Sequence, residues 1–277
     1  MSRTQLVVLG SGTPNAEADR ASAGLAIAVD DRPYLVDCGH GVVQRVVEAS
    51  AAGIINWSTV DLTRLFVTHL HADHSVGLPD LLFTPWIHGR EEKVAAFGPR
   101  GLKGMVEHIQ AAYSVNTREH LSAHPATPGG YLADVRAVQA GQVYADDRVR
   151  VYAIQADHGD MEAFSYKFVS PDKTIVVSGD TKPVAGFVEW AGSPDILAHE
   201  VYSSAQFPGR PAAWQAYHSR VHTSTEELAD LAKEIRPGLL VLYHQLFWGA
   251  TAADLVGEIE ARYDGQVVSA NDLDVYL

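Results

Sequence analysis

The stretch that decides the fold is Thr68-His69-Leu70-His71-Ala72-Asp73-His74, which places three imidazoles and one carboxylate close together. It ends an apolar run, Arg64–Thr68, that predicts a buried strand. Four polar groups that enter a loop together would each need a partner, and a cation satisfies all of them at once. The cluster therefore predicts a metal site.

One ion cannot take all four side chains with good geometry, so we expect His69 and His71 to bind one metal and Asp73 and His74 a second. Because Cys38 is the single cysteine, further ligands must be histidines or carboxylates. The best candidates each follow an apolar, strand-like run: His158, Asp180 and His244. Two divalent ions are predicted. Zinc is favoured, with manganese or iron as alternatives, because all three accept these ligand types.

The distribution of strands and helices predicts an α/β fold. Strands are predicted at Gln5–Leu9, Gly24–Val29, Pro33–Asp37, Arg64–Thr68, Val94–Phe97, Val149–Ile154, Phe164–Val169, Thr174–Ser178, Ile196–Ala198, Leu239–Tyr243 and near Val267. Helices are predicted over Val42–Ala52, Leu102–Tyr113, Thr225–Ile235 and Ala252–Arg262, and from Pro183. Strands early and late, each group followed by helices, indicate a four-layer αββα sandwich. No linker or low-complexity run interrupts the chain, so a single domain over residues 1–277 is expected.

Composition and charge limit the classes of partner. The formal net charge of −13 and the lack of a Lys/Arg cluster disfavour a nucleic-acid partner, whose affinity comes largely from basic side chains. The first residues lack the features of a signal peptide, and no apolar segment approaches the roughly 20 residues that span a bilayer. We expect a cytoplasmic protein with a small-molecule substrate. The sequence leaves open whether the chain forms a homodimer.

The ordered set of HxHxDH, a later histidine, an SGDT aspartate and a final strand-ending histidine resembles the metallo-β-lactamase superfamily. The resemblance covers nearly the whole chain and implies a metal site at one edge of the β-sandwich. It implies that His69, His71 and His158 bind the first metal and that Asp73, His74 and His244 bind the second. Asp180 would bridge the two ions.

Other segments resemble the tRNA 3′-processing endonucleases called ribonuclease Z, and small-molecule phosphodiesterases and arylsulfatase-like hydrolases share much of the pattern. The segments are Leu9–Pro14, Asp37–Gly39, Gly77–Pro79, Gly98–Leu102, Ser178–Pro183, His199–Glu200 and His222–Thr225. This resemblance implies that His222 is a proton donor assisted by Glu200. Two departures are visible: residues 98–155 hold no Gly/Pro-rich basic arm, and Gln245–Trp248 stands where the nucleases carry a serine and an arginine.

Together these features predict a binuclear hydrolase that uses a metal-bridging hydroxide on a small ester, such as a phosphodiester or sulfate ester. Asp73, His222 and Glu200 are the predicted catalytic residues. The alternatives are a lactonase or carboxylesterase, which would suit the apolar residues after His244, and a ribonuclease Z-type endonuclease. A noncatalytic binding module is disfavoured because its hallmark would be lost ligands, and all seven are present.

Two residues near the cluster have simpler predicted roles. Cys38 has no nearby base in the sequence and is predicted to be a packed core thiol. For Asp37, a hydrogen bond to a ligand histidine and a purely structural role are equally favoured.

Overall fold

The computed structural model describes residues 3–124 and 127–277. Met1 and Ser2 lie outside the described residues, and they belong to the N-terminal stretch that is predicted to lack signal-peptide features. The chain forms two compact units, each described by itself below. The first unit comprises the chain up to Gly10, Ala16–Val138 and Asp272–Leu277, and the second comprises Ser11–Asn15 and Gln139–Asn271. The single domain expected from the sequence stays a prediction.

The first unit is built on a mixed seven-stranded sheet. Its strands are β1 (Thr4–Gly10), β2 (Gly24–Val29), β3 (Arg32–Val36), β4 (Arg64–Phe66), β5 (Val94–Gly98), β6 (Ala133–Ala137) and β14 (Val275–Tyr276), in the order β14-β1-β2-β3-β4-β5-β6. Pairing is antiparallel from β14 to β3 and parallel from β3 to β6. The parallel strands place the loops that follow β3, β4 and β5 at one edge of this sheet.

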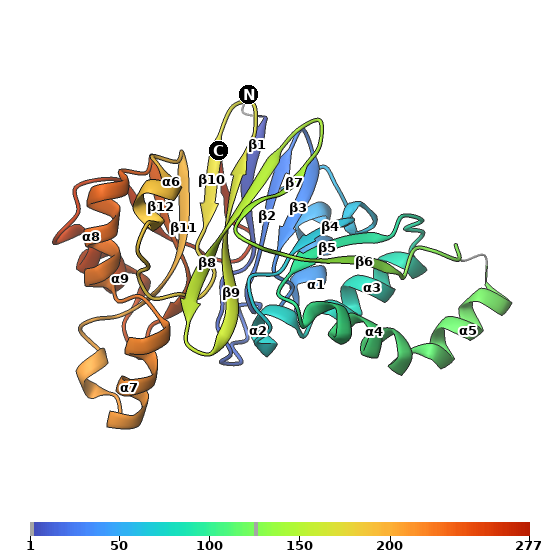
Figure 1. Cartoon of the computed structure of the whole chain (residues 1–277), viewed down its shortest axis with the longest axis horizontal. Helices are drawn as coiled ribbons and strands as arrows, with labels where there is room; N and C mark the ends of the chain where they lie inside the picture. Colours follow the sequence, from blue (N-terminus) through green and yellow to red (C-terminus); the bar gives the residue numbers. More distant parts are fainter. Residues whose placement is uncertain (1–2, 125–126) are drawn as a thin grey trace. The chain divides into compact units, whose positions relative to one another are not determined.

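The helices of the first unit are α1 (Val42–Ala51), α2 (Ala72–Ser75), α3 (Leu78–Ile87), α4 (Leu102–Ala112) and α5 (Ser114–Ala123), with a 3₁₀ turn η1 at Thr59–Asp61. Helices α1, α3 and α4 pack with the strands of the first sheet, whereas α5 extends away from it (Figure 1). In α1 the buried residues Val42, Val43, Val46 and Ala49 recur at helical spacing, and they pack with side chains of the strands in one apolar cluster. The loop that follows β4 is therefore anchored to a rigid core.

The second unit is also built on a mixed seven-stranded sheet. Its strands are β7 (Gly141–Ala145), β8 (Arg150–His158), β9 (Met161–Val169), β10 (Thr174–Val177), β11 (Ile196–Tyr202), β12 (Leu239–Leu246) and β13 (Val267–Ser269), in the order β13-β12-β11-β10-β9-β8-β7. Pairing is antiparallel from β7 to β10 and parallel from β10 to β13. The parallel strands are almost wholly buried, as their continuous apolar sequences predict.

The helices of the second unit are α6 (Phe187–Ala191), α7 (Ala212–Val221), α8 (Thr225–Ile235) and α9 (Ala252–Glu260), with a 3₁₀ turn η2 at Phe207–Gly209. Helices α6, α8 and α9 pack with β10, β11 and β12 in one apolar cluster (Figure 1). Helix α8 begins with a capping box in which Ser224 and Glu227 each satisfy the other's backbone N–H. The helix predicted from Pro183 begins only at Phe187, because Gly186 adopts a left-handed conformation just before it.

Candidate metal centre

The four clustered ligands predicted from the sequence lie together in the first unit, between β4 and the end of α2. Nε2 of His69 lies 3.1 Å from Nδ1 of His71. Nε2 of His74 lies 3.5 Å from a carboxylate oxygen of Asp73. The His69 ring also lies 4.1 Å from the His74 ring, centre to centre. The four side chains are therefore close together, and their division between two ions stays a prediction.

Asp37 holds the imidazoles of this cluster in place. Its carboxylate accepts a hydrogen bond from Nδ1 of His74 over 2.8 Å, which leaves Nε2 of that ring for another partner. The Thr68 hydroxyl donates to the same carboxylate over 2.8 Å and lies 3.0 Å from Nδ1 of His69. The Thr68 backbone N–H donates to the other oxygen of the Asp37 carboxylate. Asp37 thus orients His74 directly and His69 through Thr68, which confirms the predicted hydrogen bond to a histidine; sequence reasoning missed Thr68.

Cys38 is a buried core thiol, as predicted. Its side chain is fully buried in the apolar cluster of the first unit, and its backbone N–H donates to the His74 carbonyl. Burial, followed by the charges of Asp80 and Asp37, raises the pKa of Cys38 well above its ordinary value. The group is therefore a neutral thiol at neutral pH and has no use as a nucleophile.

We expect Cys38→Ser to leave kcat within about twofold of the wild-type value, because no step requires a thiolate. The free energy of unfolding should fall by about 1–3 kcal/mol, since a hydroxyl would be buried in apolar surroundings. Urea denaturation and steady-state kinetics check the two effects separately. A loss of kcat beyond tenfold with unchanged stability would contradict the structural role.

The second unit brings its predicted ligands together as well. His158 is the last residue of β8, and its Nδ1 lies 2.8 Å from the Val221 carbonyl oxygen, which directs Nε2 elsewhere. Asp180 follows β10, and one of its carboxylate oxygens lies 3.4 Å from Nε2 of His244. The ligand atoms of His158, Asp180 and His222 all lie within 4.8 Å of one another.

His244 does not end its strand, contrary to the sequence prediction. Strand β12 continues to Leu246. Its pairing with β11 shifts register, because His199 pairs with Leu242 whereas Val201 pairs with Gln245. The extra residue on β12 is a β-bulge, and His244 adopts the left-handed φ of 46° within it. The bulge re-aims the imidazole in mid-strand.

His222 and Glu200 form a pair in the second unit. Nδ1 of His222 lies 3.2 Å from Oε1 of Glu200, which is fully buried within β11. The same oxygen accepts the backbone N–H groups of Thr181 and Thr223 over 3.2 and 3.0 Å. Glu200 therefore fixes the loops that carry Asp180 and His222, and it faces one nitrogen of the His222 ring. The two threonines were not predicted from the sequence.

The donor set suits divalent transition metals. Each unit presents imidazole nitrogens and carboxylate oxygens that approach one another within a few ångströms, and several rings are held by their other nitrogen. Metal-binding histidines commonly have such a hydrogen bond at the ring nitrogen that does not bind the metal. The residues fit the predicted zinc, manganese or iron, because imidazole and carboxylate ligands accept all three. The chain therefore carries a metal-binding His/Asp cluster.

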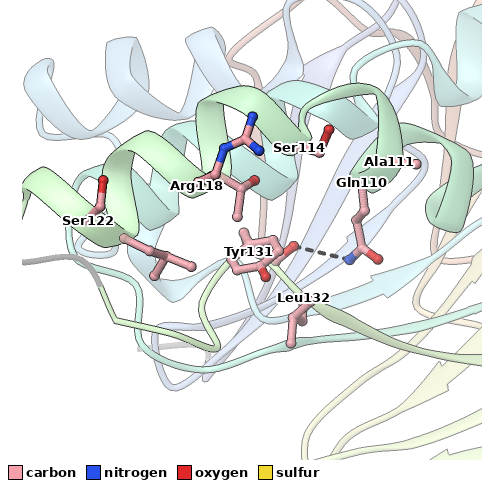
Figure 2. Close-up of a pocket in the computed structure, with 9 residues that line it drawn as sticks. Gln110, Ala111, Ser114, Arg118, Ser122, Tyr131 and Leu132 are labelled. Atoms are coloured by element: carbon pink, nitrogen blue, oxygen red, sulfur yellow. Dashed lines mark hydrogen bonds between the residues drawn. The ribbon is translucent and has the colours of Figure 1, made fainter.

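A surface cavity of about 620 Å³ lies in the first unit. Figure 2 shows it between α4, α5 and the segment of Tyr131 and Leu132, with Gln110 donating a hydrogen bond to the Tyr131 carbonyl oxygen. None of its lining residues is a predicted ligand. Among the described residues, no helix is both long and apolar enough to cross a membrane.

The two sheets, their helices and the His/Asp cluster define a metal-dependent hydrolase of the metallo-β-lactamase fold. The chain belongs to the family of the anti-Pycsar protein Apyc1, whose sequence profile matches residues 4–248. It is 30% identical to a ribonuclease Z of Mycobacterium sp. (strain KMS) over 245 residues, which is 87% of this chain and 84% of that protein.

Solved structures confirm the fold predicted from the sequence. The metallo-β-lactamase fold protein YhfI from Bacillus subtilis has a TM-score of 0.75 at 19% identity and covers 99% of both chains. The short form of human tRNase Z has a TM-score of 0.74 at 22% identity and covers 99% of this chain and 98% of its own. The predicted membership of the ribonuclease Z and phosphodiesterase branch of the superfamily is thereby confirmed.

Proposed function

We propose that the chain hydrolyses a small phosphodiester or similar ester with two divalent ions, most simply zinc. The ligands would be His69, His71, Asp73, His74, His158, Asp180 and His244. The observation that carries the proposal is the pairing of donor atoms, His69 with His71 and Asp73 with His74 at 3.1 and 3.5 Å. When bound, such ions lower the pKa of a coordinated water and polarise the ester oxygen under attack.

His222 is the proton donor in this proposal, and Glu200 positions it. A Glu200 oxygen lies 3.2 Å from Nδ1 of His222, so the proton on Nε2 is the one that can pass to a leaving oxygen. Glu200 is buried among backbone donors and cannot move with the substrate. Asp73, next to His74, completes the proposed catalytic set as a metal ligand.

A compact substrate is favoured over a folded RNA. The net charge of −13 gives little electrostatic attraction to a polyanion. Where the nucleases carry a basic Gly/Pro-rich arm, the described part of residues 98–155 forms α4, α5 and three strands, β6, β7 and β8. Ribonuclease Z activity is the second candidate, because a relative with that name is 30% identical.

A lactonase or carboxylesterase is a further candidate. That alternative depended on the apolar residues after His244. Leu246 is buried in β12, and Phe247 packs against the apolar cluster of the second unit. Trp248 lies against Arg210 and His218. Phe247 and Trp248 stay partly exposed, so an acyl-binding wall formed by them remains a prediction.

The test is a substrate panel on protein reconstituted with zinc, manganese or iron. We expect turnover of chromogenic phosphodiesters, slower turnover of sulfate esters, and less than a hundredth of the phosphodiester rate on a precursor tRNA. Metal-stripped protein is the matched control and should be inactive on every substrate. Efficient, salt-sensitive cleavage of the tRNA at its 3′ side, without turnover of small esters, would assign the nuclease activity instead.

A further inference from the structure

Arg210 is a cation without an acidic partner among the described residues of the chain. It lies between η2 and α7, half-buried, with its guanidinium carbon 5.2 Å from the centre of the Trp248 ring. Its Nε is buried and makes no hydrogen bond. Stacking on an indole face orients a guanidinium but leaves its N–H groups unsatisfied.

His218 links this cation to the proposed proton donor. Its ring lies 4.8 Å from the Trp248 ring and 5.4 Å from the His222 ring, centre to centre. The side chain is 7% exposed, and its Nδ1 is buried without a hydrogen-bond partner. Burial, with the charges of His222 and Arg210, lowers the pKa of His218 to about 4. At neutral pH the ring is therefore a neutral hydrogen-bonding group.

Nε of Arg210 and Nδ1 of His218 are both buried without a hydrogen-bond partner, and both side chains lie against Trp248. Such a pair is unusual, because buried polar groups in proteins nearly always have a hydrogen-bond partner. An oxyanion would satisfy both groups. The planar guanidinium matches the geometry of a phosphate or carboxylate, and hydrogen bonds between ionised groups are the strong ones. The described residues supply Arg210 with no carboxylate of their own, so the anion would come from a ligand.

We propose that Arg210, with His218 beside it, binds a phosphate or carboxylate carried by the leaving group of the substrate. The inference rests on the proposed function, because His222 protonates the leaving oxygen there, and the His218 ring lies beside both His222 and Trp248, on which Arg210 stacks. Arg210 is then a specificity-determining residue. The residues directly after His244, Gln245–Trp248, include no arginine, and Arg210 supplies a cation from the segment between η2 and α7 instead.

The test uses three methyl aryl phosphodiesters that differ only in the leaving group: 4-nitrophenyl, 4-carboxyphenyl and 4-phosphonophenyl. Arg210→Ala should raise KM about 10- to 100-fold for one or both anionic substrates and less than threefold for the nitrophenyl substrate. Arg210→Lys should recover part of the loss, because it keeps the charge without the planar fork. Arg220→Ala, which removes an exposed arginine from α7, is the matched control and should change nothing.

Each outcome supports or overturns the subsite. A loss confined to the carboxylate or the phosphonate arm supports it and identifies the anion. An equal loss on all three substrates, or a lowered melting temperature with unchanged substrate preference, assigns Arg210 to packing on Trp248 and overturns it. If the wild-type protein cleaves none of the three esters, the proposed function itself fails. Metal content, measured by elemental analysis, should be the same in every variant.

Discussion

Asp180→Ala should abolish hydrolysis, lowering kcat/KM by at least about 10⁴-fold. Asp180 lies between two histidines of the second unit, with a carboxylate oxygen 3.4 Å from Nε2 of His244 and 3.9 Å from Nδ1 of His222. In the proposed site Asp180 would be a ligand of both ions. Each ion stabilises the transition state by several kcal/mol, and every 1.36 kcal/mol is a factor of ten in rate. Removal of the Asp180 side chain should therefore weaken the transition-state stabilisation by both ions.

Elemental analysis separates this mechanism from simple unfolding. Wild-type protein should hold close to two ions per chain, and Asp180→Ala should hold fewer, while circular dichroism stays unchanged. Asp160→Ala is the matched control, since Asp160 is exposed in the turn between β8 and β9 and is not a proposed ligand. Full activity in wild-type protein that holds a single ion would contradict the binuclear mechanism.

Most of the fold could be predicted where local pattern and burial agree. The bounds of β2 and α8 match the sequence prediction. Strand β2 is a continuous apolar run, and α8 begins with a capping box and has apolar residues at helical spacing. Helix α3 was missed because Pro79 and Pro85 lie within it and argue against a helix, although most of its buried residues recur at helical spacing. Strands β6 and β7 were missed because both are short and largely exposed, and the alternation of Ala133, Val135 and Ala137 with polar residues in β6 is too brief a pattern to stand out.

The candidate site could be predicted as a set of residue types and less well as a geometry. The density of the His69–His74 cluster identified it, since few other arrangements explain so many imidazoles in one loop. The link from His69 through Thr68 to Asp37 depends on the parallel pairing of β3 with β4, which brings together residues 31 positions apart. The bulge at His244 and the cation of Arg210 on Trp248 are products of tertiary packing that no local pattern encodes.

His222→Ala should lower kcat by about 10²–10⁴-fold while leaving the metal content intact, because the proposed role of His222 is general acid catalysis and not metal binding. An oxygen of the Glu200 carboxylate lies 3.2 Å from Nδ1 of His222, so Nε2 is the nitrogen proposed to face the leaving oxygen. Glu200→Gln should give a smaller loss of kcat. In the double variant the two losses should not add, since Glu200 acts through His222.

The dependence on the leaving group distinguishes proton donation from a structural role for His222. A nitrophenolate leaves without protonation, so His222→Ala should lose much less activity on nitrophenyl esters than on alkyl esters, whose alkoxide needs the proton. His108→Ala, at an exposed position on α4, is the control and should behave like wild-type protein on both. Equal losses on nitrophenyl and alkyl substrates would show that His222 acts by holding the loop of Val221 and Thr223, not by donating a proton.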